Sequence, residues 1–229
     1  MLSIEKGREM NRAQKWALAC GLALAAVVVC YFFVDRPLAL LIHARLSAYR
    51  TYFMLPTLIP EPFPAVAALL VVAAGIRKLM DLPLSRPYAV ALLWSIAFAA
   101  TAGAKNFLKF AFGRTWPETW INNNPSLIRD GVYGFEPFHG GKAFAAFPSG
   151  HMAAICVAMT VLWITYPRLR VLYAFAIATV ALGLILSNYH FLSDVIAGGL
   201  LGVGIGALAV ALWERRSLPR VRSRASSAA

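Results

Sequence analysis

The chain has 229 residues, of which 60% are hydrophobic and only 14% are charged. A soluble domain averages about 25% charged residues, so this composition excludes an ordinary soluble domain and favours a membrane protein. The net charge of +12 at pH 7 would on its own suggest nucleic acid. No basic stripe alternates with exposed aromatic residues, however, and we expect no nucleic-acid partner.

Six apolar runs follow one another along the chain, most of them close to the roughly 20 residues that a helix needs to cross a hydrocarbon core. Helices are favoured because an open sheet cannot satisfy its backbone in lipid, and a barrel would show alternating polarity. The runs are 16–34, 62–76, 88–107, 152–166, 171–187 and 195–213. The sequence therefore predicts an all-α polytopic membrane protein with six transmembrane helices in a bundle.

The basic residues predict the orientation of this bundle. If the N-terminus is cytoplasmic, most Lys and Arg residues fall on the cytoplasmic side, which places both termini there by the positive-inside rule. We expect a basic N-terminus over 1–15, a membrane domain over 16–213 with an outer loop at 113–147, and a basic tail over 214–229. The expected location is the bacterial inner membrane, with the polar loop facing the periplasm. The sequence indicates no oligomeric state.

Neither a metal nor another cofactor is expected. The three cysteines, Cys20, Cys30 and Cys156, all lie inside apolar runs without a Cys-x-x-Cys spacing, which is typical of small core residues. The chain also lacks a carboxylate cluster of the kind that holds Mg²⁺.

The segment 113–147 is a long connection rich in aromatic residues. Long connections without regular structure tend to be functional or disordered, and aromatic residues argue against disorder. We expect it to form a lid or a wall of a substrate entrance.

His190 and Asp194 lie four residues apart, at the start of the last apolar run. On a helix this spacing puts both side chains on one face, where the carboxylate can accept a hydrogen bond from one imidazole nitrogen. The other nitrogen is then free to act as a nucleophile or a base. The alternative is an acidic residue that merely favours the first turn of a helix.

Pro148-Ser149-Gly150-His151 precedes the fourth apolar run. Proline and serine favour a helix start, and the free N–H groups there form an anion site strengthened by the helix dipole. His151 would point into that site. The alternative is an ordinary helix cap with a histidine at the membrane interface.

Three cations are expected on the same side of the membrane. Lys105 and Lys109 are one helical turn apart at the end of the third run, and Arg114 follows shortly after. Lysines at such a place can simply extend to the interface. Their combination with two histidines and a helix terminus instead predicts a phosphate site.

This combination resembles the type 2 phosphatidic acid phosphatase superfamily, whose signature is Lys-x6-Arg-Pro, Pro-Ser-Gly-His and Ser-Arg-x5-His-x3-Asp. The second part is complete at 148–151, and the third keeps His190 and Asp194, followed by Val195-Ile196-Ala197-Gly198. The resemblance runs from about Lys105 to Gly198, and the first 100 residues carry no signature.

Two arginines of the signature are missing in register. Counting from Lys109, the first arginine position holds Trp116, although Pro117 follows as expected, and Arg114 lies two residues early. Counting back from His190, the Ser-Arg positions hold Gly183 and Leu184. We expect Arg114 to take over one arginine, and Lys105 or Arg129 to cover part of the other.

The resemblance implies a two-step phosphoryl transfer without a metal. His190 would attack phosphorus and form a phosphohistidine, Asp194 would orient it, and His151 would be the general acid and then the base. The implied phosphate-binding residues are Lys105, Lys109, Arg114, Ser149 and Gly150. The expected function is a lipid phosphate phosphatase acting on a phosphomonoester or pyrophosphate in the bilayer. A lipid phosphotransferase, or a non-enzymatic lipid-binding or transport protein, is the alternative.

Overall fold

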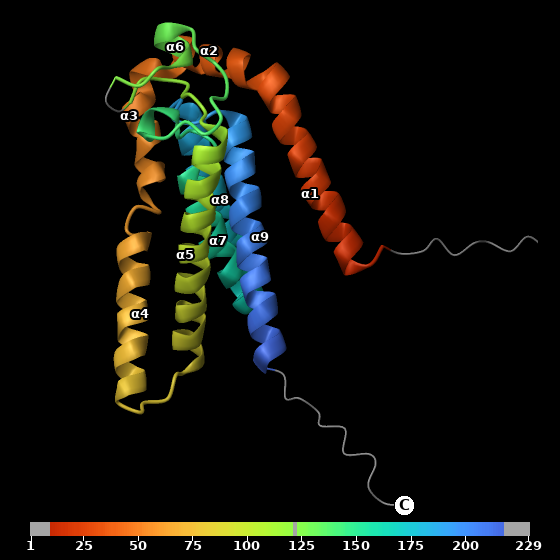
Figure 1. Ribbon diagram of the computed structural model, residues 1–229, viewed down its shortest axis with the longest axis vertical. Coiled ribbons are helices and arrows are strands. Elements are labelled where there is room, and N and C mark those ends of the chain that lie inside the picture. The colour runs from red at the N-terminus through yellow and green to blue at the C-terminus, as the bar shows by residue number, and fades with distance from the viewer. Residues whose placement is uncertain (1–9, 121–122, 218–229) are drawn as a thin grey trace, which may run out of the picture.

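The computed structural model describes residues 10–120 and 123–217, and within these ranges the regular structure is helical, with only isolated β-bridges. Five helices lie side by side, while a sixth, α1, leans away from them (Figure 1). The five are α4 (Phe63–Leu79), α5 (Arg86–Phe112), α7 (Gly150–Thr165), α8 (Arg170–Leu186) and α9 (Leu192–Ser217), and α1 is Arg12–Val29.

Each predicted apolar run lies largely within helix. Four helical stretches are long and apolar enough to cross a membrane, namely 13–79, 86–112, 167–186 and 192–215, and α7 is a shorter apolar helix. The first stretch contains two of the predicted runs and includes a turn at 59–62. The all-helical class is thus confirmed, whereas the count of six crossings and the orientation of the termini stay predictions. The predicted basic ends fall partly outside the described residues, at 1–9 and 218–229.

Short helical elements cover one end of the bundle. They follow α1, and most of them lie at the top of Figure 1, together with α6 (Leu127–Asp130). In chain order they are η1 (Cys30–Val34), α2 (Asp35–Leu46), η2 (Ser47–Tyr49), α3 (Arg50–Met54) and η3 (Leu55–Leu58). This end is also where the loop 113–147 folds back.

The loop 113–147 is more structured than the sequence predicts. It contains α6 (Leu127–Asp130) and the short 3₁₀ turn η4 (Lys142–Phe144). Bridges join Arg114 to both Phe135 and Ala145. Several of its aromatic residues pack on one another, as do Phe135 and Phe147, whose ring centroids are 5.4 Å apart. The loop therefore forms a packed wall over the end of the bundle.

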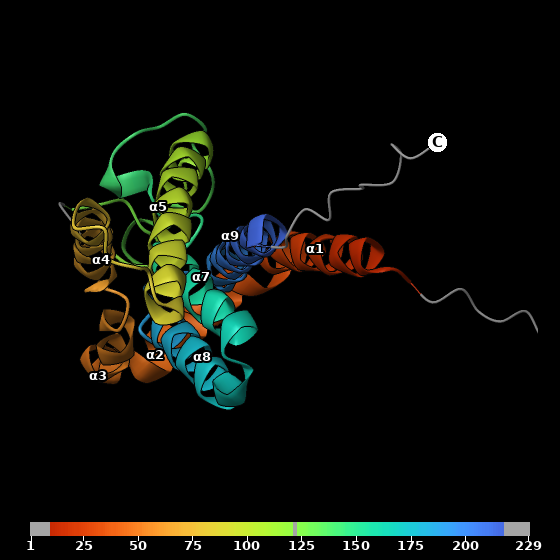
Figure 2. The same ribbon diagram turned by 90° about the horizontal axis from the view of Figure 1, so that it is seen from below.

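Helix α7 lies at the centre, between α5, α8 and α9 (Figure 2). Its closest neighbour is α9, because glycines let the two backbones approach. A Cβ at Gly198 would come within 2.4 Å of the Ser149 carbonyl oxygen, and one at Gly202 within 2.4 Å of the Ala153 oxygen. Small residues permit this kind of close helix packing in membranes. The approach brings the starts of α7 and α9, and hence both histidine motifs, together.

Candidate active site

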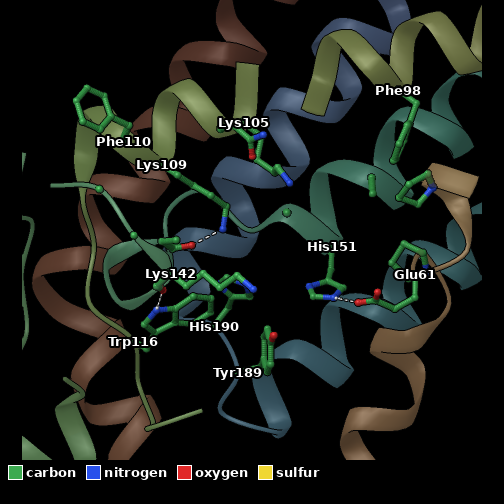
Figure 3. A pocket seen from close by; sticks show the side chains of 18 of the residues that line it. Glu61, Phe98, Lys105, Lys109, Phe110, Trp116, Lys142, His151, Tyr189 and His190 are labelled. Atoms are coloured by element: carbon green, nitrogen blue, oxygen red, sulfur yellow. Dashed lines mark hydrogen bonds and ion pairs between the residues drawn. The ribbon is translucent and has the colours of Figure 1, made fainter. Parts of the chain in front are cut away.

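A cavity of about 590 Å³ lies at the end of the bundle that the short helical elements cover. It is bounded by the starts of α4 and α7, the end of α5, and the loop 139–145. Figure 3 shows its lining side chains. The ionisable groups around it are Glu61, Lys105, Lys109, His139, Lys142, His151, Tyr189 and His190. Segments that are up to 129 positions apart in the sequence, from Glu61 to His190, thus share one site.

His190 and Asp194 are paired, but not on one helix face. Helix α9 begins at Leu192, so His190 lies just before the helix and Asp194 in its first turn. The His190 Nδ1 is 3.4 Å from Asp194 Oδ2, and the Phe191 N–H donates to the same oxygen at 3.0 Å. The helical geometry expected from the spacing is therefore wrong, while the contact that it predicted is present.

The environment of His190 keeps the imidazole neutral. Burial lowers the pKa of His190 to about 4, the positive charges of Lys109 and His151 act in the same direction, and Asp194 opposes them. The side chain is only 1% exposed, although the cavity reaches it. A neutral imidazole has the lone pair that a nucleophile needs, so His190 is competent to attack at neutral pH.

Arg114 lies behind this pair, in a fully buried ionic cluster. Its guanidinium donates to Asp194 and to Asp35, the latter at 2.8 Å. Ser193 and Tyr133 are further acceptors of Arg114. Arg114 is not among the residues that line the cavity. The structure therefore places it as a support for Asp194 and not where a bound phosphate would lie.

His151 pairs with Glu61 in the wall of the cavity. The His151 Nε2 is 2.8 Å from Glu61 Oε1, and Figure 3 shows the two side chains pointing toward each other. Tyr189 stands between the two histidines, with its ring centroid 5.4 Å from that of His151 and 5.2 Å from that of His190. The two motif histidines, His151 and His190, thus each have their own carboxylate partner.

The Pro148–His151 segment forms the start of α7 as the sequence predicts. The Ser149 Oγ caps the helix by accepting from the Met152 N–H at 3.4 Å. The Ser149 N–H, however, already donates to the Asp194 carbonyl oxygen at 3.0 Å, and Ser149 is fully buried. Its expected use as a phosphate-binding amide is therefore wrong. Gly150 does line the cavity, and its N–H has no intrahelical acceptor because it is the first residue of α7.

Both lysines of α5 reach the cavity. The Lys109 ammonium donates to the Ala145 carbonyl oxygen, which ties α5 to the covering loop. Lys105 lies beside Gly150, close enough that a Cβ there would be 3.0 Å from Lys105 Cδ. Trp116, which stands at the first missing arginine position, also lines the cavity, and its ring centroid is 5.0 Å from that of His190.

Neither the residue at the second missing arginine position nor its expected substitute Arg129 lines the cavity. Leu184, at the second missing arginine position, is fully buried in the apolar core with Val180. Arg129 donates to Asp130 and to the loop backbone, and it is not among the residues that line the cavity. No cation therefore replaces the second arginine from these positions.

Sequence reasoning missed Glu61, Lys142 and Asp35. Asp35 ends an apolar run and Glu61 stands between two prolines at the start of another, where an isolated carboxylate is costly and is a functional-site signal. Lys142 follows the pair Gly140-Gly141 in the aromatic loop. These local signals exist, but none of them identifies the partner residue.

Comparison with known proteins identifies similar sequences. A family model described as the PAP2 superfamily matches residues 88–218. A lipid A 1-phosphatase from Rhizobium johnstonii is 31% identical over 129 residues, which are 56% of this chain and 48% of the relative. A lipid A 1-phosphatase from Rhizobium etli is 30% identical over 148 residues, which are 62% of this chain and 60% of the relative. The matched part thus spans about half of the first relative and three fifths of the second.

A solved structure has the same fold. It is a transmembrane PAP2-type phosphatidylglycerolphosphate phosphatase from Bacillus subtilis, which is 18% identical with a TM-score of 0.60. The match covers 93% of this chain and 100% of the other. Together with the apolar helices, this fold identifies an integral membrane protein. Because the family model matches more than half of the chain, including both histidine motifs, the protein belongs to the PAP2 superfamily.

Proposed function

We propose that the protein is a metal-independent lipid phosphate phosphatase whose active site lies at the outer, periplasmic face of the inner membrane. It would hydrolyse a phosphomonoester or pyrophosphate of a membrane lipid through a phosphohistidine intermediate. The observation that carries this proposal is that one part of the cavity wall is basic and another part is apolar. Three histidines and three lysines line one part of the cavity, and apolar side chains continue the wall away from them.

The apolar part of the wall fits the rest of a lipid. Phe98, Pro64 and Ala154 line the cavity. Phe98 lies eleven residues before Lys109 on α5, which corresponds to about 16 Å along a helix. The cavity therefore spans from cations suited to a phosphate to a depth suited to acyl or isoprenyl chains. A water-soluble phosphate ester would make no use of that depth.

The first chemical step would be attack on phosphorus. The neutral His190 imidazole, oriented through its Nδ1 by Asp194, attacks with Nε2, and the bond from phosphorus to the lipid oxygen breaks. Protonated His151 gives its proton to the departing lipid oxygen. The ammonium groups of Lys105 and Lys109 would stabilise charge on the non-bridging oxygens, together with the Gly150 N–H.

The second step would remove the phosphoryl group from His190. His151, now neutral, accepts a proton from water, and the resulting hydroxide oxygen attacks phosphorus. The nitrogen–phosphorus bond breaks, inorganic phosphate leaves, and both histidines return to their starting states. Lysines and a backbone amide supply the positive charge throughout, so we propose that no metal takes part. Within residues 10–120 and 123–217 no cluster of three potential ligands gathers.

The function is tested with a panel of lipid phosphates in EDTA. The panel contains lipid A 1-phosphate and phosphatidylglycerol phosphate, which the names of the relatives suggest, together with phosphatidic acid and an isoprenyl pyrophosphate. We expect purified protein to release inorganic phosphate from at least one of them at a rate that EDTA does not lower. Phosphate that appears on an acceptor lipid instead of in solution would indicate a transferase. No phosphoryl transfer from any lipid would contradict the proposal.

Glu61 would act as a positioning residue for His151. Its carboxylate accepts from His151 and stabilises the imidazolium that the first step needs. We expect Glu61→Gln, which keeps the hydrogen-bonding shape without the charge, to lower kcat about 10- to 100-fold with little change in KM, because general acid catalysis contributes on the order of 10²–10⁴. Glu136→Gln is the control, since Glu136 is exposed on the loop and does not line the cavity. An unchanged kcat in Glu61→Gln would remove Glu61 from the mechanism.

A further inference from the structure

The cavity contains a cation that no motif supplies. Lys142 lines it from the loop 113–147, opposite the lysines of α5. Figure 3 shows the Lys142 side chain extending from the loop, across Trp116, into the cavity toward the side where His151 lies. In the part of the chain that the structure describes, its ammonium group has neither a hydrogen-bond nor an ion-pair partner. Its charge is therefore free to meet an anion.

The ammonium group of Lys109 is less available to a ligand than that of Lys142. Its ammonium already donates to the Ala145 carbonyl oxygen, and it lies 5.6 Å from the centroid of the Trp116 ring. A lysine that holds the backbone of the loop has fewer donors left for a ligand, since an ammonium group has three. Of the three lysines at the cavity, Lys109 therefore contributes partly as an anchor for the segment that carries Lys142.

The loop around Lys142 is built to hold it in place. Gly141 has φ of +95°, a backbone conformation that favours glycine, and it turns the chain so that Lys142 begins the 3₁₀ turn η4. The rings of His139 and Phe144 close this turn with their centroids 4.0 Å apart. The Trp116 Nε1–H donates to the Lys142 carbonyl oxygen at 2.9 Å. The backbone of Lys142 is therefore fixed while its side chain remains free.

Trp116 and Lys142 form a complementary pair. Trp116 occupies the place in the first motif where the signature has an arginine, and it is 6% exposed against the wall of the cavity. An indole carries no positive charge, so the motif alone leaves the cavity one cation short. The same indole N–H holds the residue that brings an ammonium group into the cavity. The charge lost from the motif is thus regained from the loop.

We propose that Lys142 is a phosphate-binding residue of this site, positioned by Trp116, and that it supplies the positive charge that the first motif lacks. The ligand that it meets is the phosphoryl group of the substrate or the inorganic phosphate product. The inference rests on the proposed function and names a further residue of its site.

The test compares Lys142→Met with Lys142→Arg, which keeps the charge. We expect Lys142→Met to weaken the binding of radiolabelled inorganic phosphate to the detergent-solubilised protein, measured by equilibrium dialysis, about 10-fold. We expect it to lower kcat/KM for the best lipid of the panel about 10- to 100-fold. Lys142→Arg keeps the positive charge, and both lysine and arginine make charge-assisted hydrogen bonds to phosphate, so we expect it to stay within about fivefold of the original protein in both measurements.

The control is Lys78→Met, which removes one positive charge from an exposed lysine in the last turn of α4, away from the cavity. It is expected to behave as the original protein. Equal phosphate affinity and equal kcat/KM in Lys142→Met would overturn the inference and leave the proposed function standing. A protein that binds phosphate through Lys142 but hydrolyses no lipid would contradict the proposed function and leave the inference standing. Lys142 is exposed, so its replacement is not expected to impair folding.

Discussion

Replacing His190 by alanine is expected to abolish phosphatase activity and the formation of a phosphoenzyme. The substitution removes the nitrogen proposed to attack the phosphorus of the substrate, and loss of a nucleophile that acts together with its partners costs on the order of 10⁴–10⁶ in kcat. The measurement is single-turnover release of radiolabelled phosphate from the preferred lipid, with parallel quenching in base and in acid to detect a phosphohistidine. Phosphohistidine is stable in base and labile in acid, which separates it from a phosphoserine.

His43→Ala is the matched control. His43 is a histidine at the same end of the bundle, but it pairs with Glu118 at 2.7 Å and does not line the cavity. Glu118 keeps Arg50 and Asn188 as partners when His43 is absent, so this variant is expected to retain most of its activity. Near-normal hydrolysis by His190→Ala would show that the nucleophile is another group.

Replacing Arg114 by methionine is expected to destabilise the protein and to inactivate it. Arg114 is 0% exposed and neutralises two carboxylates that are also fully buried, those of Asp35 and Asp194. Removing one partner of a buried ion pair leaves an uncompensated charge and costs about 3–5 kcal/mol. Asp194 would lose its orientation with respect to His190. Thermal unfolding in detergent measures the first effect, and phosphoenzyme trapping in the folded fraction measures the second.

The double variant Arg114→Met with Asp35→Asn separates a structural role from phosphate binding. If Arg114 serves the buried cluster, removing the Asp35 charge relieves part of the penalty, and the double variant is more stable than Arg114→Met alone. A direct phosphate contact predicts no such recovery, because Asp35 then has no share in the effect. Adjacent buried partners are expected to couple in this way by about 0.5–3 kcal/mol.

The helical class was predictable because lipid allows few solutions. A chain that is 60% hydrophobic in long runs must satisfy its backbone within each segment, so composition and run length already indicate helices. The two histidines were predictable for a similar reason. Histidines at the starts of apolar runs, in a spacing shared with a known family, are readily explained by a shared active site.

The role of the cations was not predictable to the same degree. A lysine or arginine in a motif carries the same charge in the sequence whether it lines a cavity or neutralises a buried carboxylate. Arg114 lies two residues from its expected register, and that offset is enough for its side chain to reach Asp35 and Asp194 instead of the cavity. The Ser149 amide likewise lies in the expected motif and is already bonded.

The linear sequence was sufficient for the fold class, the family and the two histidines, because these depend on hydrophobicity and on spacings within one segment. The assignment of partners required the packed structure. Glu61 meets His151 across 90 residues, and Asp35 meets Arg114 across 79. Such contacts depend on how closely the helices approach one another and on how a loop folds back. Neither quantity is encoded in any single segment, so the charges around the histidines could be assigned only in three dimensions.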